Sequence, residues 1–126
     1  MSVLIVETQE NLGQLWCQSL RQHGVAVGLC QTQEAAIAYL RSARVDVIVL
    51  NLMLGRGNSL AIADYASYRQ PSAKVMFVTN APVFSDGSIF EHSPNACAFL
   101  PAGIPPEDLA AMVMHHGQIE KVSSYA

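Results

Sequence analysis

The sequence predicts an α/β fold in which helices cover both faces of a five-stranded parallel sheet, a three-layer α/β/α sandwich. Short apolar runs bounded by turn residues alternate with segments of helical periodicity, the pattern of parallel strands joined by crossover helices. One run, VDVIVLN, is almost continuously apolar, as is typical of a central strand covered on both faces. The 126 residues contain no repeat and no Pro/Gly/Ser-rich linker, so we expect a single domain.

The expected elements follow one another in a strict strand-then-helix order. We expect strands at 2–7, 25–30, 45–51, 73–80 and 96–101, and helices at 10–24, 32–43, 60–70, 82–92 and 105–117. The helix at 82–92 is weak because a glycine interrupts it. The tail 118–126 has no clear pattern, which places the core of the domain at about 3–117.

Residues at the helix ends support these boundaries. Gly24 supplies a C-terminal stop for the first helix. Thr32 is a plausible N-cap of the second helix, with Glu34 in the first turn, where the helix dipole favours an acid. Asn58 or Ser59 can cap the third helix.

Composition excludes several classes of function. Apolar residues make up 51% of the chain and charged residues 13%, against a usual charged share of about a quarter, so the surface is short of charge and favours a protein partner. The net charge of -3, without a cluster of bases, excludes a nucleic-acid footprint. The start, MSVLIVET, lacks the basic region of a signal peptide and its apolar run is far below the ~20 residues that span a membrane. We therefore expect a cytoplasmic, soluble protein.

Polar residues stand where three of the strands end, and an alanine stands at the end of another. In doubly wound parallel sheets, ligands and chemistry lie at the carboxyl ends of the strands, beside the point where the strand order reverses. Glu7 and Thr8 follow the first strand, Asn51 ends the third, Thr79 ends the fourth, and Ala102 follows the fifth. These five residues are the candidate site.

The sequence around these positions resembles the receiver domain of two-component response regulators, the CheY-like domain. LIVET resembles its apolar strand that ends in two acids, and VIVLNLMLGRGNSL resembles its strand, aspartate and Leu-Met-Leu-Pro-Gly-like loop. VMFVTN resembles the strand that ends in Thr or Ser, and AFLPAGIPPEDL the strand that precedes Lys-Pro and the last helix. The resemblance runs from Val3 to about Gly117 and implies a flavodoxin-like fold with strand order 2-1-3-4-5.

The resemblance assigns a role to each matching position. Asn51 occupies the place of the phosphorylated aspartate, and Glu7 with Thr8 that of the acidic pair that holds Mg²⁺, to which a backbone carbonyl near Met53 would add. Thr79 keeps the hydroxyl of the family and Phe99 stands at its switch aromatic; both also fit a plain strand-end hydroxyl and a core aromatic. Ala102 replaces the lysine and Gly103 the proline after it.

These replacements remove the chemistry of phosphoryl transfer. The reaction needs a carboxylate nucleophile, a Mg²⁺ ion and a cation for the developing charge, and an amide is not a nucleophile. We expect Mg²⁺ binding to be weak or absent, because Thr8 and Asn51 are neutral. The expected function is a stand-alone, degenerate receiver (a pseudo-receiver) in bacterial signalling, not an enzyme, without a cofactor. Taken alone, Asn51 also fits a turn residue that closes a strand.

A partner face is expected on the last two helices and the fifth strand. In the last helix, the stripe Leu109, Met112, Val113 and His116 should face the sheet. That leaves Ala110, Ala111 and Met114 on an outer side without charge, next to Phe84, Ile89 and Phe90 of the weak helix. This surface predicts a protein partner or a second copy of the chain. The alternative is that the three residues of the weak helix tuck inward.

Two further classes stay open. A nucleotide- or flavin-binding module would use the same sheet, but ETQENLG after the first strand has no Gly-rich or Ser/Thr-rich phosphate cradle. A Cys/His hydrolase would need Cys30 or Cys97 to meet a histidine at the strand ends. No CxxC and no zinc-ligand spacing occurs, so we expect reduced core cysteines and no metal site. His115 and His116 fit a helix-end role.

Overall fold

The computed structural model describes residues 1–54, 57–79 and 95–123, and of residues 118–123 the backbone alone. The strands are β1 (Ser2–Val6), β2 (Ala26–Cys30), β3 (Val47–Asn51), β4 (Lys74–Thr79) and β5 (Ala96–Pro101); the helices are α1 (Glu10–Arg21), α2 (Gln33–Ser42), α3 (Ser59–Arg69) and α5 (Pro106–Ser123). All neighbouring strands are parallel, in the order β2-β1-β3-β4-β5. The predicted fold and strand order are confirmed. The helix expected at 82–92 lies outside the described residues.

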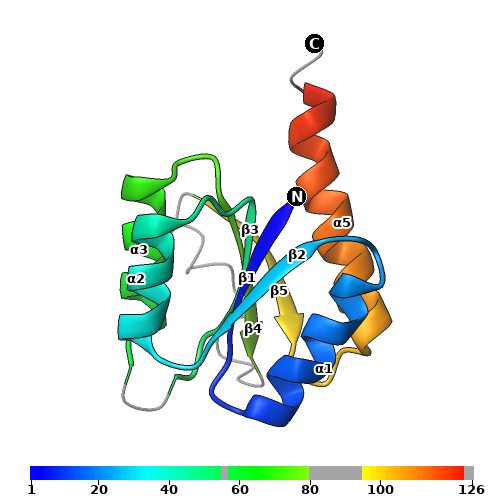
Figure 1. The fold of residues 1–126 in the computed structure, drawn as a ribbon, viewed down its shortest axis with the longest axis horizontal. Helices are drawn as coiled ribbons and strands as arrows, with labels where there is room; N and C mark the ends of the chain where they lie inside the picture. Colours follow the sequence, from blue (N-terminus) through cyan, green and yellow to red (C-terminus); the bar gives the residue numbers. More distant parts are fainter. Residues whose placement is uncertain (55–56, 80–94, 124–126) are drawn as a thin grey trace.

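Two hydrophobic cores, one on each face of the sheet, hold the layers together. Figure 1 shows α2 and α3 on one side of the sheet and α1 and α5 on the other. Side chains alternate along each strand, so Leu4 of β1 packs toward α2 and α3, whereas Val3 and Ile5 pack toward α1 and α5. β3 is buried from Val47 to Leu50. It is therefore the central strand that its sequence predicts.

Local side-chain chemistry fixes the helix ends as expected. The Thr32 hydroxyl accepts a hydrogen bond from the Ala35 N–H at 3.1 Å, and the Asn58 side chain accepts one from the Ala61 N–H at 3.1 Å. Gly24 follows α1 with a φ of 75°, a conformation that only glycine adopts without strain. Of the two candidates for capping α3, Asn58 is the N-cap.

The predicted partner face needs one correction. Ala110, expected on the outer side of the last helix, is completely buried. The reason is a second neighbour: α5 packs against α1 as well as the sheet, and the Ser19 hydroxyl of α1 donates to the Pro106 carbonyl at 3.0 Å. A helix with two neighbours buries a wider arc than the single stripe that faces a sheet. Met114 is half-buried against the same core.

The C-terminal boundary also differs from the expectation. The segment from residue 118, whose sequence has no clear pattern, continues α5 as far as Ser123. Figure 1 shows this end of α5 extending past the edge of the sheet. Within the described part of the chain, no helix has the length and apolar character needed to cross a membrane.

Candidate functional site

Parallel pairing brings the predicted site residues to one edge of the sheet. Val6 is in register with Leu50, so Glu7, which follows β1, lies beside Asn51 at the end of β3. Asn51 is in register with Val78, one residue before Thr79 at the end of β4, and Thr79 pairs with Pro101 at the end of β5. Neighbouring strand ends thus bring Glu7, Asn51 and Thr79 to the same edge of the sheet, as the sequence predicts. We call this edge, at the carboxyl ends of the strands, the rim.

The centre of the rim is a hydrogen-bonded pair formed by Asn51 and Glu7. Nδ2 of Asn51 donates to both carboxylate oxygens of Glu7, to Oε1 at 2.8 Å and to Oε2 at 2.6 Å. Oε2 also accepts the backbone N–H of Thr8 at 2.9 Å. Glu7 is 1% exposed, and its backbone N–H donates to the Cys30 carbonyl at 3.0 Å. The carboxylate is thus buried on a fixed backbone and held by N–H donors.

The orientation of the Asn51 amide is determined from both sides. Its Oδ1 accepts the backbone N–H of Met53 at 2.8 Å, while its Nδ2 faces Glu7. A reversed amide would set oxygen against the carboxylate and NH₂ against an N–H donor, losing both interactions. Asn51 is therefore more than a turn residue. The Oδ1 bond closes the turn after β3, and the Nδ2 bonds tie β3 to the residue after β1.

Hydrogen bonding explains how Glu7 can remain buried. Moving a carboxylate out of water is costly unless donors replace the lost hydration. Among the residues that the structure describes, no ion pair involves Glu7. Neutral N–H groups therefore replace the water that the carboxylate loses on burial. A hydrogen bond to a charged group contributes about 1.5–3 kcal/mol, more than one between neutral groups. The Asn51 amide therefore stabilises Glu7 at a place where the receiver family is expected to use a cation.

The remaining predicted residues surround this pair. Thr8 is exposed and Thr79 half-buried. Ala102 is half-buried and packs on the core beneath α1 and α5, in a turn closed by the Ile104 N–H and the Pro101 carbonyl at 3.1 Å. Met53 is 62% exposed. Ala102 brings no charge to the rim.

Phe99 packs as an aromatic of the core. Its ring stacks on the ring of the buried Phe77 of β4, with a centroid separation of 5.3 Å and an interplanar angle of 20°. Phe99 itself is half-buried and packs against the core under α2 and α3. This geometry is compatible with a switch residue and with a static core aromatic alike.

The rim is a poor match for Mg²⁺. The ion is held by oxygen ligands, usually carboxylates together with several waters. Glu7 supplies the carboxylate, but both of its oxygens face the partly positive NH₂ of Asn51. Among the residues that the structure describes, no three His, Cys, Asp or Glu side chains are grouped so that they could hold a metal ion.

The thiols show no sign of activation. Burial raises the pKa of the Cys17 and Cys30 thiols, and raises that of Cys97 to about 11, against the effect of Lys74. A nucleophilic cysteine needs a lowered pKa, usually from a neighbouring cation or histidine. Cys97 also lies near the start of β5, at the opposite end from the rim. These thiols offer no support for a Cys/His hydrolase.

The flavin alternative gains no support from the first loop. Only three residues separate β1 from α1, and Gln9 at the N-cap makes no side-chain capping bond. Glu10 stands in the first turn of α1, where its charge opposes the binding of a phosphate. The helix end that would cradle a phosphate in such a module is therefore acidic.

The predicted partner face is described only in part. Phe84, Ile89 and Phe90 lie outside the described residues.

A cluster of polar and basic residues that the sequence did not reveal lies at the other end of the sheet. Here Gln70 binds the end of α2, and three arginines surround a hollow. Its contacts join residues 25 to 30 positions apart, and no local pattern signals them.

The fold and the polar rim together define a protein of the doubly wound, flavodoxin-like class with its site at the strand ends. The sequence profile of the response regulator receiver domain matches residues 3–113. The chain belongs to this family. No curated protein sequence matches the chain.

Solved structures of low sequence identity share the fold. A CheY-like receiver domain protein of Methanospirillum hungatei JF-1 is 18% identical, with a TM-score of 0.87 and 97% of each chain covered. The N-terminal domain of a response regulator/sensory box/GGDEF 3-domain protein of Carboxydothermus hydrogenoformans is 19% identical, with a TM-score of 0.83 and coverage of 98% and 99%. A response regulator of Burkholderia pseudomallei, solved with a phosphorylated aspartic acid, calcium ion and citrate, is 18% identical, with a TM-score of 0.76 and coverage of 94% and 74%.

Proposed function

We propose that this chain is a pseudo-receiver, a receiver-family module of a bacterial two-component pathway that acts through protein contact and accepts no phosphoryl group at residue 51. The observation that carries the proposal is the hydrogen-bonded pair of Asn51 and Glu7. The Burkholderia relative carries a phosphorylated aspartic acid, a modification that requires a carboxylate oxygen as nucleophile. Asn51 has no such oxygen, and its NH₂ group is engaged with Glu7.

Two more replacements support the absence of phosphoryl transfer. Developing negative charge on a phosphoryl group has to be stabilised by cations, and each such contact is commonly worth several kcal/mol. Thr8 is neutral and Ala102 carries no charge. Position 8 therefore offers no second acid for Mg²⁺, and position 102 offers no lysine. The module is therefore proposed to be neither an enzyme nor a Mg²⁺-dependent switch. It is proposed to act in the cytoplasm.

The direct test is incubation with acetyl phosphate and Mg²⁺, followed by intact-mass spectrometry at neutral pH. No phosphate should be added to residue 51. The Asn51→Asp variant should gain little, because Thr8 and Ala102 remain. The triple variant Thr8→Asp, Asn51→Asp, Ala102→Lys is the matched positive control and should be labelled. A phosphate on residue 51 of the wild type, or efficient labelling of Asn51→Asp alone, would refute the proposal.

The contact surface is proposed to include β5 and the outer side of α5 near Met114. This region is short of charge, and Met114 is half-buried rather than enclosed. Sedimentation velocity over a range of concentrations tests whether a second copy is the partner. Met114→Glu should abolish dimer formation, or the capture of a different partner. The matched control is Ala38→Glu, at an exposed position of α2 on the other face of the sheet. Equal sedimentation and equal partner capture by Met114→Glu and the wild type would show that this face is not the contact surface.

A further inference from the structure

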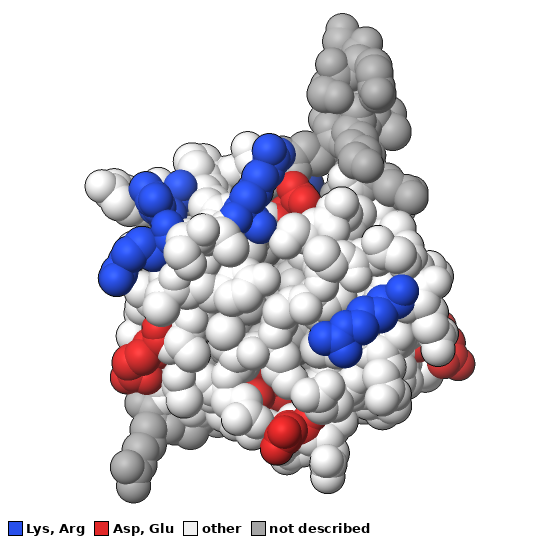
Figure 2. Space-filling view, viewed as in Figure 1, with Lys and Arg blue, Asp and Glu red and all other residues white. Residues whose placement is uncertain are grey.

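Basic side chains gather at the end of the molecule opposite to the rim. Figure 2 shows them at the upper end of the view, over the C-terminal ends of α2 and α3, with one acidic group beside them and one further basic side chain over α1. Arg41, Arg44 and Arg69 line a hollow of about 330 Å³ here, together with Ser42, Ala43 and Gln70. Three of the seven Lys and Arg residues thus surround one hollow in a chain of net charge -3.

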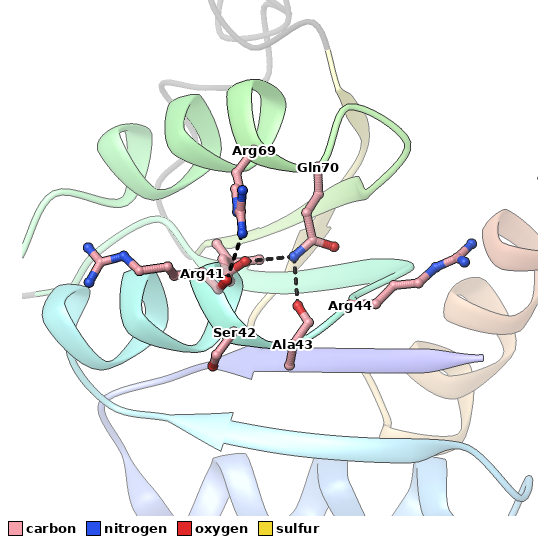
Figure 3. A pocket seen from close by; sticks show the side chains of 7 residues that line it. Arg41, Ser42, Ala43, Arg44, Arg69 and Gln70 are labelled. Carbon is pink, nitrogen blue, oxygen red and sulfur yellow. Dashed lines mark hydrogen bonds between the residues drawn. The ribbon is translucent and has the colours of Figure 1, made fainter.

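The floor of this hollow is rigid because α3 caps the end of α2. Nε2 of Gln70 donates to the carbonyls of Leu40 at 2.8 Å and Ala43 at 2.7 Å, and its Oε1 accepts the N–H of Val45 at 2.8 Å. Arg69 donates to the Arg41 carbonyl at 3.0 Å (Figure 3). Carbonyls that would be left unpaired at the helix end are satisfied by a neighbouring helix.

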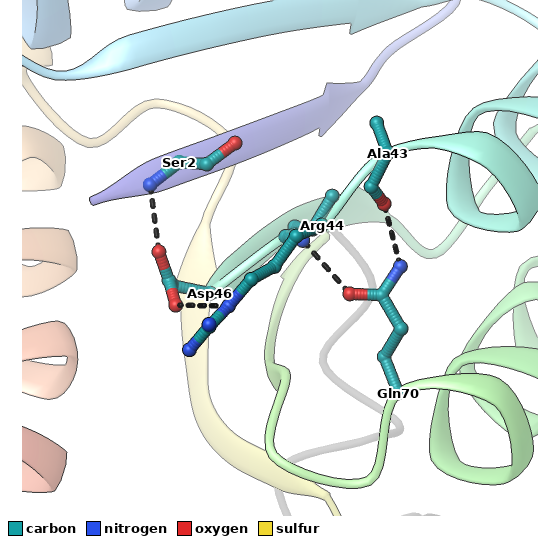
Figure 4. Close-up of polar contacts among 6 residues, drawn as sticks. Ser2, Ala43, Arg44, Asp46 and Gln70 are labelled. Atoms are coloured by element: carbon teal, nitrogen blue, oxygen red, sulfur yellow. Dashed lines mark hydrogen bonds and ion pairs between the residues drawn. The ribbon is translucent and has the colours of Figure 1, made fainter.

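Helix ends by themselves explain only part of this charge. The helix dipole favours a basic residue in the last turn, and Arg41 and Arg69 occupy those positions in α2 and α3. Arg44 lies beyond the end of α2. Its side chain is 86% exposed, and its contact with Asp46 is long, at 3.8 Å. Asp46 is also engaged by the Ser2 N–H at 2.8 Å (Figure 4). The hollow therefore keeps excess positive charge that the fold does not use.

The arrangement of the guanidinium groups selects the kind of ligand. In Figure 3, Arg41 and Arg44 point to opposite sides of the hollow, with Arg69 between them. A single phosphate is normally clamped by donors that converge on one point. Spread cations fit several separate anionic groups instead, such as the carboxylates along a peptide. Arginine is also enriched at protein interfaces, and complementary charge raises the rate and specificity of association.

We propose that the hollow between the C-terminal ends of α2 and α3 is a docking site for an acidic segment of a partner protein, with Arg41, Arg44 and Arg69 as its cationic contacts. This site is separate from the rim and from the face at β5 and α5. It lies at the amino ends of the strands, so a partner bound there leaves the rim uncovered. The inference does not depend on whether residue 51 accepts a phosphoryl group.

The test uses the full chain and a fluorescein-labelled oligoglutamate peptide, with binding followed by fluorescence anisotropy at low salt. Arg44→Glu should weaken binding about three- to tenfold, the range expected for reversing one exposed charge in a contact. Arg21→Glu, the same change at an exposed position on α1, should change binding less than about twofold. On titration, amide signals of residues 40–44 and 69–70 should shift, and those of Glu7 and Asn51 should not.

Several results would overturn the docking site. They are a lack of binding by the wild type, equal weakening by Arg44→Glu and Arg21→Glu, or equal binding of an oligolysine peptide. Displacement of the peptide by inorganic phosphate, at concentrations where chloride of equal ionic strength has no effect, would show a small-anion site instead. If the chain binds phosphatidylserine vesicles more tightly than the peptide, with the same dependence on Arg44, the ligand of the hollow is an anionic membrane surface and not a partner protein.

Discussion

Replacing Asn51 by aspartate should destabilise this protein, although aspartate is the residue that its family is expected to carry there. In the wild type, Nδ2 of Asn51 lies 2.8 Å and 2.6 Å from the two oxygens of the buried Glu7. Asn51→Asp puts an oxygen in that place. It removes hydrogen bonds to a charged group, worth about 1.5–3 kcal/mol, and sets two carboxylates against each other. Two like charges 4 Å apart repel by about 4 kcal/mol at an effective dielectric constant of 20, and rotation of the new side chain relieves part of this.

The expected loss is therefore about 3–5 kcal/mol of unfolding free energy at neutral pH without divalent ions, a large part of the usual 5–15 kcal/mol. Asn51→Ala is the matched control: it removes the hydrogen bonds without adding charge and should lose about 1.5–3 kcal/mol. Glu7→Gln combined with Asn51→Asp exchanges donor and acceptor, and should recover most of the loss.

Urea denaturation measures these differences directly. Trp16 is the only tryptophan and is completely buried, so its fluorescence reports global unfolding. Midpoints and slopes for the four proteins, in buffer with EDTA, give the free energies. Equal stability of Asn51→Asp and the wild type would show that Asn51 does not stabilise Glu7. If the double variant Glu7→Gln, Asn51→Asp is no more stable than Asn51→Asp alone, the stability lost in Asn51→Asp does not come from its contact with Glu7.

Two further predictions concern the far end of the sheet and the thiols, and a third concerns a histidine. Gln70→Ala should lower the free energy of unfolding by about 2–3 kcal/mol in urea denaturation, because three hydrogen bonds at the end of α2 are lost, and an equally stable variant would contradict the capping. Cys97, with a pKa of about 11, should react with iodoacetamide at pH 8 at about a thousandth of its limiting rate; fast reaction in the folded protein would contradict the raised pKa. Burial, His115 and Lys74 lower the pKa of His116, so its contribution to stability should be present above about pH 6.5 and lost as pH falls below that value. His116→Gln should reduce this loss in urea midpoints measured across that range, and an unchanged pH profile would contradict it.

Features set by neighbouring residues could be read from the sequence. The apolar run of β3 predicts a central strand, and β3 is buried on both faces. Thr32 and Asn58 cap their helices through bonds to residues three positions on, so the sequence alone contains both partners. The alternation of strands and helices predicts that the polar strand ends cluster, and the family resemblance implies the strand order. Register then sets Glu7 beside Asn51.

Features set by tertiary contact could not be read in this way. Ala110 is buried because α1 covers the side of α5 that the sheet leaves open, and a helical stripe contains no information about a second neighbour. The capping of α2 by Gln70 depends on how α3 packs beside it. The bond from Asn51 to Glu7 joins residues 44 positions apart. The sequence could name both residues of this pair but could not show that they satisfy each other.

That pairing gives the asparagine at position 51 a physical consequence. A buried carboxylate without a cation needs N–H donors, and a half-buried amide is stabilised by an acceptor for its NH₂. Glu7 and Asn51 each supply what the other needs, so replacing Asn51 alone removes donors from the buried Glu7 carboxylate or sets like groups together. Aspartate therefore cannot replace Asn51 in a single step without a loss of stability, unless a divalent ion or a change at position 7 compensates. On the function that we propose, the rim with its Asn51–Glu7 pair is a stable arrangement of the fold rather than an active site that lacks one group.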